Sequence, residues 1–433
     1  MSIGLTTVLL FLVFGVLLLL GLPISVSIIV SSIVTAMGTL SWDQITFITM
    51  QKMNSGVESF SLLAVPLFIL AGNIMNNGGI ARRLINFAQL FVGRIPGSLA
   101  QANILGNMFF GALAGSSVAA ASAMGGCIGP MEKEEGYDPS FAAAANIASA
   151  PTGLLIPPTS ALIVYSTVAG GVSISTLFMA GYVPGILMGL GCMLVALVYA
   201  LRYGMKPVRL NIEKSTLQVI GEAVPSLLLI VVVIGGIVSG IFTATEGAGI
   251  CVLYCLILSI CYKNIDFSSF IGILLESAKV SGIILFLISA SSAMSFVMAY
   301  AGIPGAISQA LLSISDNTYV LFLLMNMILL AVGMFMDITP AILIFTPIFL
   351  PIAHSLGMSD IQFGIMLIFN MCLGNITPPV GSVLFVGCGV ANVSIESVSV
   401  KLVPYFAVLI FILMLVTFIP EISLGVPRMM GLI

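Results

Sequence analysis

The octapeptide GLLIPPTS at residues 153–160 decides the fold of this chain, because a second copy, GNITPPVG, stands at residues 374–381. The two stretches lie 221 positions apart in a sequence of 433 residues. The same offset aligns further positions without a gap: Pro130 with Pro351, Gly136 with Gly357, and residues 172–174 with residues 393–395. Self-similarity at a fixed offset predicts two copies of one structural unit.

The composition places both copies in a membrane. Hydrophobic residues make up 60 % of the chain and charged residues 7 %, which leaves too little polar surface to cover a water-soluble globule. Several apolar runs approach the length of about 20 residues that a helix needs to cross a hydrocarbon core of about 30 Å. We therefore predict an all-α polytopic membrane protein.

We expect each copy to contain three crossings, a re-entrant hairpin that enters and leaves on one side, a broken helix and a final crossing. The odd number of crossings inverts the second copy relative to the first. The first crossings would be residues 3–21, 24–40 and 59–76, and the hairpins residues 97–130 and 318–351. The first repeat covers residues 1–215, with scaffold helices 1–95, a transport hairpin and broken helix 96–181, and a scaffold helix 182–215. The second covers residues 216–433, with scaffold helices 216–316, a transport hairpin and broken helix 317–396, and a final helix 397–433.

The basic residues test this topology independently of the repeat. Of the 13 Lys and Arg residues, all but Lys52 and Arg428 fall on one side of the expected arrangement. Cytoplasmic loops carry an excess of Lys and Arg. The basic side is therefore expected to be cytoplasmic and both termini periplasmic.

The paired prolines predict broken helices. Proline has no N–H and crowds the carbonyl four residues earlier, so Pro157-Pro158 frees the carbonyls of Gly153 and Leu154. By the same argument Pro378-Pro379 frees the carbonyls of Gly374 and Asn375. Free carbonyls at membrane depth are tolerated where they line a polar cavity, and their oxygens can bind a cation. The helix that starts at each proline points its free N–H groups and the positive end of its dipole at the same place, which favours an anion. The alternative is a proline kink satisfied by hydroxyl side chains and neighbouring helices.

The expected hairpin tips supply the second part of each candidate site. The first reads GALAGSSVAAASA at residues 111–123, whose small residues allow close backbone approach, and the second reads GMFMDITP at residues 333–340. Asp337 aligns with Ser116 at the common offset. A carboxylate within the membrane is a functional candidate because its burial there is costly. Its alternative role is to cap the helix that follows, and the two roles are compatible.

Five stretches together resemble the large membrane subunit of tripartite ATP-independent periplasmic (TRAP) transporters, over nearly the whole chain. They are AVPLFILAGNIM (64–75), GALAGSSVA (111–119), IASAPTGLLIPPTSALIVYS (147–166), GMFMDITPA (333–341) and GNITPPVG (374–381). The resemblance implies an elevator-type fold of the ion-transporter superfamily, in which a scaffold holds a mobile unit of two re-entrant hairpins and two broken helices. It is greatest to sialic acid transporters, and C4-dicarboxylate members share the same motifs.

The resemblance also implies the site residues. Na⁺ as coupling ion would be held between each tip and its break by Gly115, Ser116, Ser117, Gly153, Pro157, Pro158, Met336, Asp337, Thr339, Gly374, Thr377 and Pro378. The substrate would be held by Ser116, Thr159, Ser160, Asp337 and Asn375.

The implied partners follow from the same family. They are a soluble periplasmic binding protein that delivers an organic acid, and a small four-helix membrane subunit. We expect that subunit to be a separate chain, because no additional four-helix segment precedes residue 1. The implied location is the bacterial inner membrane, and no basic patch suggests nucleic acid.

Other functions compete with a Na⁺-coupled importer. A stand-alone Na⁺/carboxylate symporter would need no binding protein, and a passive scaffold subunit would leave the paired breaks and Asp337 without a purpose. A membrane-embedded enzyme is disfavoured because His354 is the single histidine and the seven cysteines form no CxxC or Cys/His cluster. The same observation predicts no transition-metal site.

Overall fold

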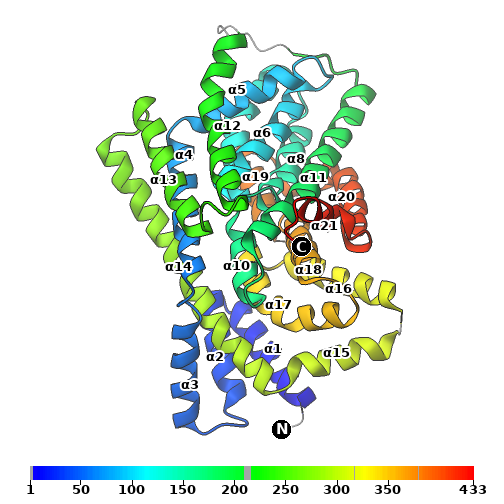
Figure 1. The fold of residues 1–433 in the computed structure, drawn as a ribbon. Helices are drawn as coiled ribbons and strands as arrows, with labels where there is room; N and C mark the ends of the chain where they lie inside the picture. The colour runs from blue at the N-terminus through cyan, green and yellow to red at the C-terminus, as the bar shows by residue number, and fades with distance from the viewer. Residues whose placement is uncertain (1–2, 209–215, 316, 379) are drawn as a thin grey trace.

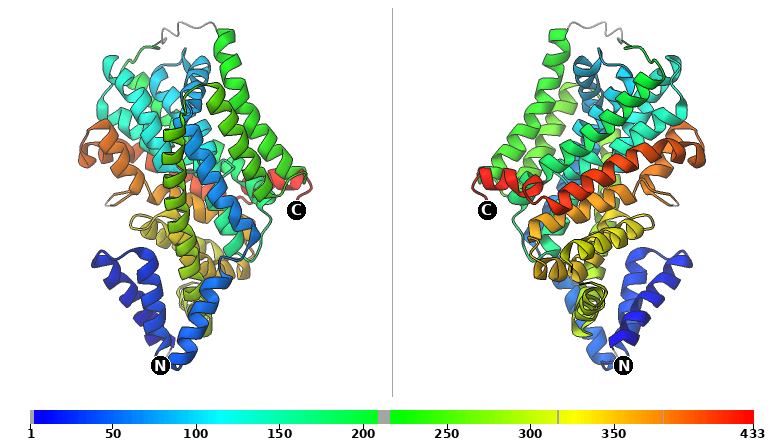
Figure 2. Two further views of the ribbon diagram at one scale, coloured as in Figure 1. Left: turned by 90° about the vertical axis from the view of Figure 1, so that its left-hand side faces the viewer. Right: turned by 90° about the vertical axis from the view of Figure 1, so that its right-hand side faces the viewer.

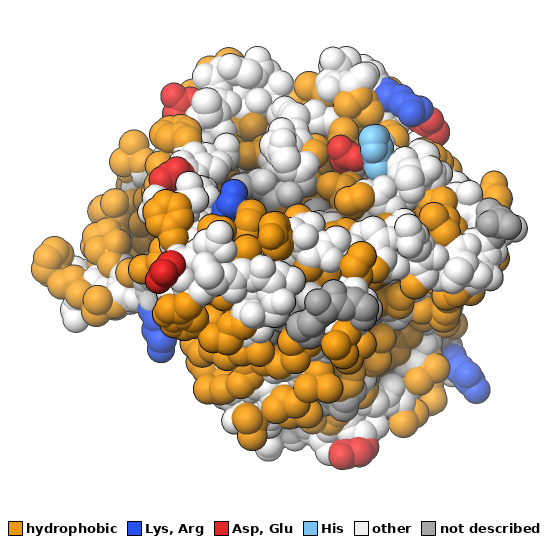
Figure 3. Space-filling model, turned by 90° about the horizontal axis from the view of Figure 1, so that it is seen from below, with side chains coloured by type: hydrophobic (Ala, Val, Ile, Leu, Met, Phe, Trp, Pro, Cys, Tyr) orange, Lys and Arg blue, Asp and Glu red, His pale blue; other side chains and the backbone are white. Residues whose placement is uncertain are grey.

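The computed structural model describes residues 3–208, 216–315, 317–378 and 380–433, and in them all regular secondary structure is helical (Figure 1). Seven described helices are long and apolar enough to cross a membrane, and a bent pair adds an eighth. The face seen from below shows extended apolar areas with charged side chains scattered among them (Figure 3). The prediction of an all-α polytopic membrane protein is confirmed.

One group of helices surrounds the long helix α14. Helices α2, α3 and α4 pack along α14, α13 packs on α4, and α12 bridges α5 and α13. The group comprises α1 (Ile3–Leu19), α2 (Ile24–Ala36), α3 (Trp42–Ser55), the 3₁₀ turn η1 (Phe60–Leu63), α4 (Ala64–Asn77), α5 (Ile80–Val92), α12 (Thr216–Val238), α13 (Ala244–Cys261), α14 (Phe267–Tyr300) and α15 (Ile303–Ile314).

A second group contains both hairpins and both broken helices. Its first half comprises α6 (Ser98–Ala114), α7 (Ser117–Glu134), α8 (Pro139–Ser149), α9 (Thr152–Leu155), α10 (Ser160–Val168) and α11 (Ile174–Arg202). Its second half comprises α16 (Thr318–Gly333), α17 (Ile338–Ser355), α18 (Asp360–Gly374), α19 (Ser382–Ala391), α20 (Ile395–Phe418) and α21 (Glu421–Met429). Figure 1 shows the α6–α7 hairpin in the upper part of the molecule and the α16–α17 hairpin in the lower part.

The two halves meet where their broken helices touch. The thiol of Cys372 lies 3.5 Å from the carbonyl oxygen of Pro151, and these two residues are 221 positions apart. The hydroxyl of Tyr165 on α10 donates to the carbonyl of Asp360 on α18 at 2.5 Å. The two broken helices therefore touch at residues that hold equivalent positions in the two repeats.

The N-terminal helices differ from the sequence expectation. Helix α2 has 13 residues, a length of about 20 Å, so it is too short to make the full crossing predicted for residues 24–40. Residues 37–40 form a turn instead, and α3 follows from Trp42 to Ser55. Both views of Figure 2 show α1, α2 and α3 together at the N-terminal end of the molecule.

Candidate substrate and cation sites

The first predicted break lies between α8 and α10. Helix α8 ends at Ser149, the single turn α9 follows, and α10 begins at Ser160 with a bend of 48° relative to the preceding segment. The peptide bond between Pro157 and Pro158 is cis. Thr159, expected to bind substrate, is fully buried, and its hydroxyl accepts a hydrogen bond from the N–H of Leu162 at 3.4 Å. Its role in the structure is to cap α10.

The first hairpin tip rests against this break. Gly115 ends α6 in the left-handed conformation, with φ of +60°, and its N–H donates to the carbonyl of Gly111 at 2.8 Å. A β-carbon placed on Gly115 would lie 3.8 Å from the backbone nitrogen of Ser160 and 3.9 Å from the carbonyl oxygen of Pro158. Ser116 then caps α7 through the N–H of Ala119. The structure thus brings together the tip and break that the sequence paired.

A glycine on each partner makes this approach possible. A β-carbon on Gly153 would lie 2.1 Å from the carbonyl carbon of Gly111, so the backbones of α6 and α9 touch there. The second half repeats the contact, because a β-carbon on Gly374 would lie 2.4 Å from the carbonyl carbon of Gly333. The segment from Gly333 to Gly374 is one residue shorter than the segment from Gly111 to Gly153. The common offset therefore holds for Ser116 and Asp337 and for Gly153 and Gly374, whereas Gly111 and Gly333 are 222 positions apart.

Asp337 links the second tip to the second break. It occupies the N-cap position of α17 without making a side-chain capping bond, and its Oδ1 accepts a hydrogen bond from Nδ2 of Asn375 at 3.3 Å. The N–H of Gly381 donates to the carbonyl of Met334 at 3.3 Å, which is a further tie between break and tip. Pro379 lies outside the described residues.

The expectation that the carbonyls of Gly374 and Asn375 are left free is wrong. The chain turns back after α18, so the N–H of Thr377 donates to the carbonyl of Gly374 at 2.9 Å and the N–H of Val383 donates to that of Asn375 at 3.1 Å. The hydroxyl of Thr377 donates to the carbonyl of Leu373 at 2.6 Å. Each carbonyl oxygen has a second lone pair, which is the part that a cation can use.

A cavity of about 490 Å³ joins the two tips. Six of the predicted site residues line it: Gly115, Ser116, Ser117, Ser160, Asp337 and Thr339. Gly153, Thr159, Met336, Gly374 and Asn375 are buried beside it without lining it. Pro157, Pro158, Thr377 and Pro378 lie in the breaks and do not line it either. The cavity therefore divides the predicted set into residues that a solute can touch and residues that shape the backbone around it.

Three further polar residues line this cavity from α4 and α14: Asn73, Asn76 and Glu276. The sequence pattern had pointed to none of them as a ligand. The amide of Asn73 donates to the hydroxyl of Ser277 at 2.8 Å, joining α4 to α14. Glu276 is exposed to the cavity, and its signal in the sequence is a carboxylate inside the 34-residue apolar helix α14.

The comparisons with known proteins agree with this architecture. The family described as "Tripartite ATP-independent periplasmic transporter, DctM component" matches residues 11–422. The chain is 49 % identical to the uncharacterised protein YgiK of Salmonella typhimurium, over 96 % of each chain. It is 34 % identical to the C4-dicarboxylate TRAP transporter large permease protein DctM of Rhodobacter capsulatus, over 97 % of this chain and 99 % of that one. It is 33 % identical to the sialic acid TRAP transporter large permease protein SiaM of Vibrio cholerae, over 95 % and 96 %.

A solved structure supports the fold at low sequence identity. The YdaH transporter of Alcanivorax borkumensis superposes with a TM-score of 0.57 at 15 % identity, over 87 % of this chain and 89 % of that one. The family match covers nearly all of the chain, and the described helices agree with it. The chain belongs to the DctM-component family of tripartite ATP-independent periplasmic transporters, as one of their large membrane subunits.

Proposed function

We propose that this chain is the membrane subunit of a Na⁺-coupled secondary importer, which moves an organic acid from a periplasmic binding protein into the cytoplasm by an elevator motion. The family makes it a membrane component of an organic-acid transporter and a multi-pass inner-membrane protein. The finer proposal concerns the coupling ion and the motion. We also propose that both termini face the periplasm.

The observation that supports Na⁺ coupling is the charge of the cavity between the tips. Two carboxylates line it, Asp337 and Glu276, and none of the lining residues is Lys or Arg. An organic anion entering such a space meets net negative charge, which disfavours binding. Cations bound with the substrate offset this repulsion, and hydroxyl, carboxylate and carbonyl oxygens are the ligands that Na⁺ prefers. We assign this role to the residues predicted for Na⁺, above all Ser116, Ser117 and Asp337.

We propose an elevator motion in which α11 and α20 travel with the hairpins. Helix α11 packs on α6, α9 and α18, and α20 packs on α8, α11 and α18, whereas α11 has little contact with α12. This proposal differs from the sequence expectation, which placed residues 182–215 and 397–433 outside the transport unit.

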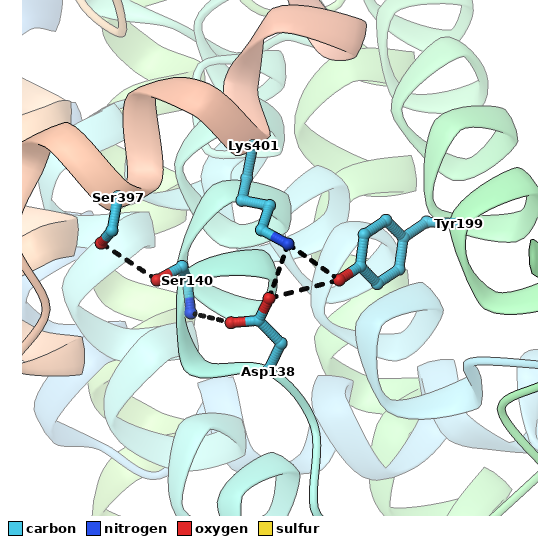
Figure 4. Close-up of polar contacts among 5 residues, drawn as sticks. All are labelled: Asp138, Ser140, Tyr199, Ser397 and Lys401. Atoms are coloured by element: carbon cyan, nitrogen blue, oxygen red, sulfur yellow. Dashed lines mark hydrogen bonds and ion pairs between the residues drawn. The ribbon is translucent and has the colours of Figure 1, made fainter. Parts of the chain in front are cut away.

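A polar cluster ties these two helices to the first broken helix (Figure 4). Nζ of Lys401 on α20 lies 2.7 Å from Oδ2 of Asp138 and donates to the hydroxyl of Tyr199 on α11 at 3.1 Å. Tyr199 donates to Asp138 at 3.2 Å. The hydroxyl of Ser140 on α8 lies 3.0 Å from that of Ser397 on α20. One shared network therefore holds α8, α11 and α20 together.

We expect Lys401→Met and Asp138→Asn to destabilise the protein non-additively. Both side chains are partly exposed, 27 % and 36 %, so each change should cost about 1 kcal/mol or less. The double variant should be no less stable than the worse single variant, because both changes remove one network. Thermal unfolding in lipid nanodiscs measures this. Arg428→Met is the control, since Arg428 pairs with Glu421 at an exposed site and should change little. Additive losses would contradict a shared network.

Uptake by proteoliposomes tests the proposed function. The chain would be reconstituted with a small membrane subunit and a cognate binding protein, and radiolabelled sialic acid and a C4-dicarboxylate would be offered with a Na⁺ gradient or with choline in place of Na⁺. We expect uptake of one acid that needs both Na⁺ and the binding protein. Uptake that needs Na⁺ alone would support the stand-alone carboxylate symporter, and uptake unchanged in choline would overturn Na⁺ coupling.

A further inference from the structure

A second cavity, of about 400 Å³, lies at the base of the first hairpin. It is bounded by α6, α7, α8 and the end of α19, and Asn103, Glu132, Lys133, Asn146 and Asn392 are among its lining residues. It shares no lining residue with the cavity between the tips. The hairpin was expected to end at Pro130, but α7 continues through this proline to Glu134, which brings Glu132 inside the fold.

Glu132 is a buried carboxyl group without a counter-ion. Glu132 is 1 % exposed, and its Oε1 atom is buried with no hydrogen-bond partner. No ion pair to it forms among the described residues. A buried carboxylate left in this state costs several kcal/mol, and the group escapes that cost by taking up a proton.

The neighbouring side chains supply little compensation. The Asn103 amide, on α6, is the one side chain that offers Glu132 a hydrogen bond among the described residues, and its buried nitrogen has no other partner. A single neutral amide does not replace the hydration of a carboxylate. Glu132 lies outside the candidate spans, and burial raises its pKa to about 7, with a smaller opposing effect from the Asn103 amide.

The other titratable groups near Glu132 are neutral, engaged or exposed. Tyr137 and Tyr405 carry no charge at neutral pH, and Lys401 is paired with Asp138. Lys133 is exposed at the rim of the cavity. The titratable groups that interact electrostatically with Glu132 are Tyr137 and Tyr405, and Lys133 lines the same cavity. Glu134, Glu135, Asp138 and Lys401 follow on the neighbouring turns of α7, α8 and α20, and Arg83 on α5 lies over the ring of Tyr262. None of them neutralises a charge on Glu132.

We propose that Glu132 is a proton-binding site at the base of the first hairpin, separate from the candidate Na⁺ sites at the tips. With a proton bound, Glu132 carries no charge and α6, α7 and α19 stay packed around it. Loss of the proton leaves a buried charge that draws water into the cavity and loosens this packing. The site thereby makes the stability of the hairpin unit depend on pH, and the inference does not depend on the identity of the transported acid.

The sign of the pH effect follows from linkage. The pKa of Glu132 in the folded protein is raised above its ordinary value of 4.5 to about 7. The stability that it contributes is therefore fully present below the ordinary value and is lost as pH rises through the folded value.

The test compares Glu132→Gln, a neutral isostere, with Glu134→Gln, a control at the exposed neighbouring carboxylate. Thermal unfolding of both variants and of the natural chain would be followed in nanodiscs between about pH 5 and pH 8.5 in fixed NaCl. We expect the natural chain and Glu134→Gln to lose several degrees of Tm relative to Glu132→Gln as pH rises from about 5 to about 7, and the difference to stay constant at higher pH. Parallel pH profiles for the natural chain and Glu132→Gln would overturn the proposal.

Two further measurements keep the result decisive. If NaCl, but not choline chloride, restores the lost stability of the natural chain at high pH and has no effect on Glu132→Gln, the site takes Na⁺ and the proton assignment is wrong.

If Glu132→Gln does not fold, dicyclohexylcarbodiimide can be used on the natural chain, because it modifies protonated carboxyl groups in apolar surroundings. Modification of Glu132, followed by mass spectrometry, should decline as pH rises through 7, and a yield independent of pH would contradict the proposal.

Discussion

Replacing Gly153 or Gly374 by alanine should abolish folding or transport. At Gly153 the new β-carbon would lie 2.1 Å from a backbone carbon of Gly111, and at Gly374 it would lie 2.4 Å from a backbone carbon of Gly333. Neither neighbour is a side-chain end that could rotate away, so the hairpin must separate from its broken helix. Overpacking a buried contact costs about 1–3 kcal/mol or more. Here it also displaces the tip from the break, so we expect the loss of uptake to exceed the loss of stability.

Gly129→Ala is the matched control. Gly129 lies on α7 of the same hairpin, and a β-carbon placed on it has no neighbour within 4 Å. Alanine there should keep uptake and raise stability slightly, because glycine inside a helix is less favourable than alanine by about 1 kcal/mol. Size-exclusion profiles and thermal unfolding would separate misfolding from a folded but inactive protein. Normal uptake by Gly153→Ala would show that the two backbones do not need to approach so closely.

The arrangement of tips and breaks was predictable because it depends on strong local signals. Proline removes a backbone donor and glycine permits close approach wherever they occur in a helix. The paired prolines therefore located both breaks, and the small residues at 111–123 located the first tip. The structure places Gly115 against Ser160 and Asp337 against Asn375. The roles of these residues as Na⁺ or substrate ligands stay predictions.

Other features depend on contacts that an apolar sequence does not specify. Lipid-facing and protein-facing helix surfaces have similar composition, because lipid chains are as apolar as leucine. The packing of α11 and α20 on the hairpins could not be derived for this reason. Glu276 and Glu132 were missed for different reasons. The cavity that Glu276 faces is completed by both halves of the chain, and Glu132 stands in a charged segment, residues 132–135, that resembles an exposed loop.

Asp337→Asn should weaken Na⁺-dependent uptake strongly while leaving the fold intact. Asparagine is as good an N-cap as aspartate, so α17 keeps its cap position, and Asn375 keeps an oxygen acceptor at residue 337. What the variant loses is the negative charge in the cavity. A charge-assisted contact is worth about 1.5–3 kcal/mol, which corresponds to a loss in Na⁺ affinity of about 10- to 100-fold. The measurement is initial uptake rate against Na⁺ concentration in proteoliposomes.

This substitution also separates the two roles that the sequence left open for Asp337. If the residue only caps α17, Asp337→Asn should transport normally, and that result would remove Asp337 from the cation site. If it holds Na⁺, uptake should fall for Asp337→Asn and recover in part at high Na⁺ concentration, while Asp43→Asn, at an exposed carboxylate on α3, behaves like the natural chain.

Glu276→Gln leaves Asp337 in place and removes the other carboxylate of the cavity. Because that carboxylate comes from α14, outside the hairpins, its loss should change the apparent affinity for the acid more than that for Na⁺.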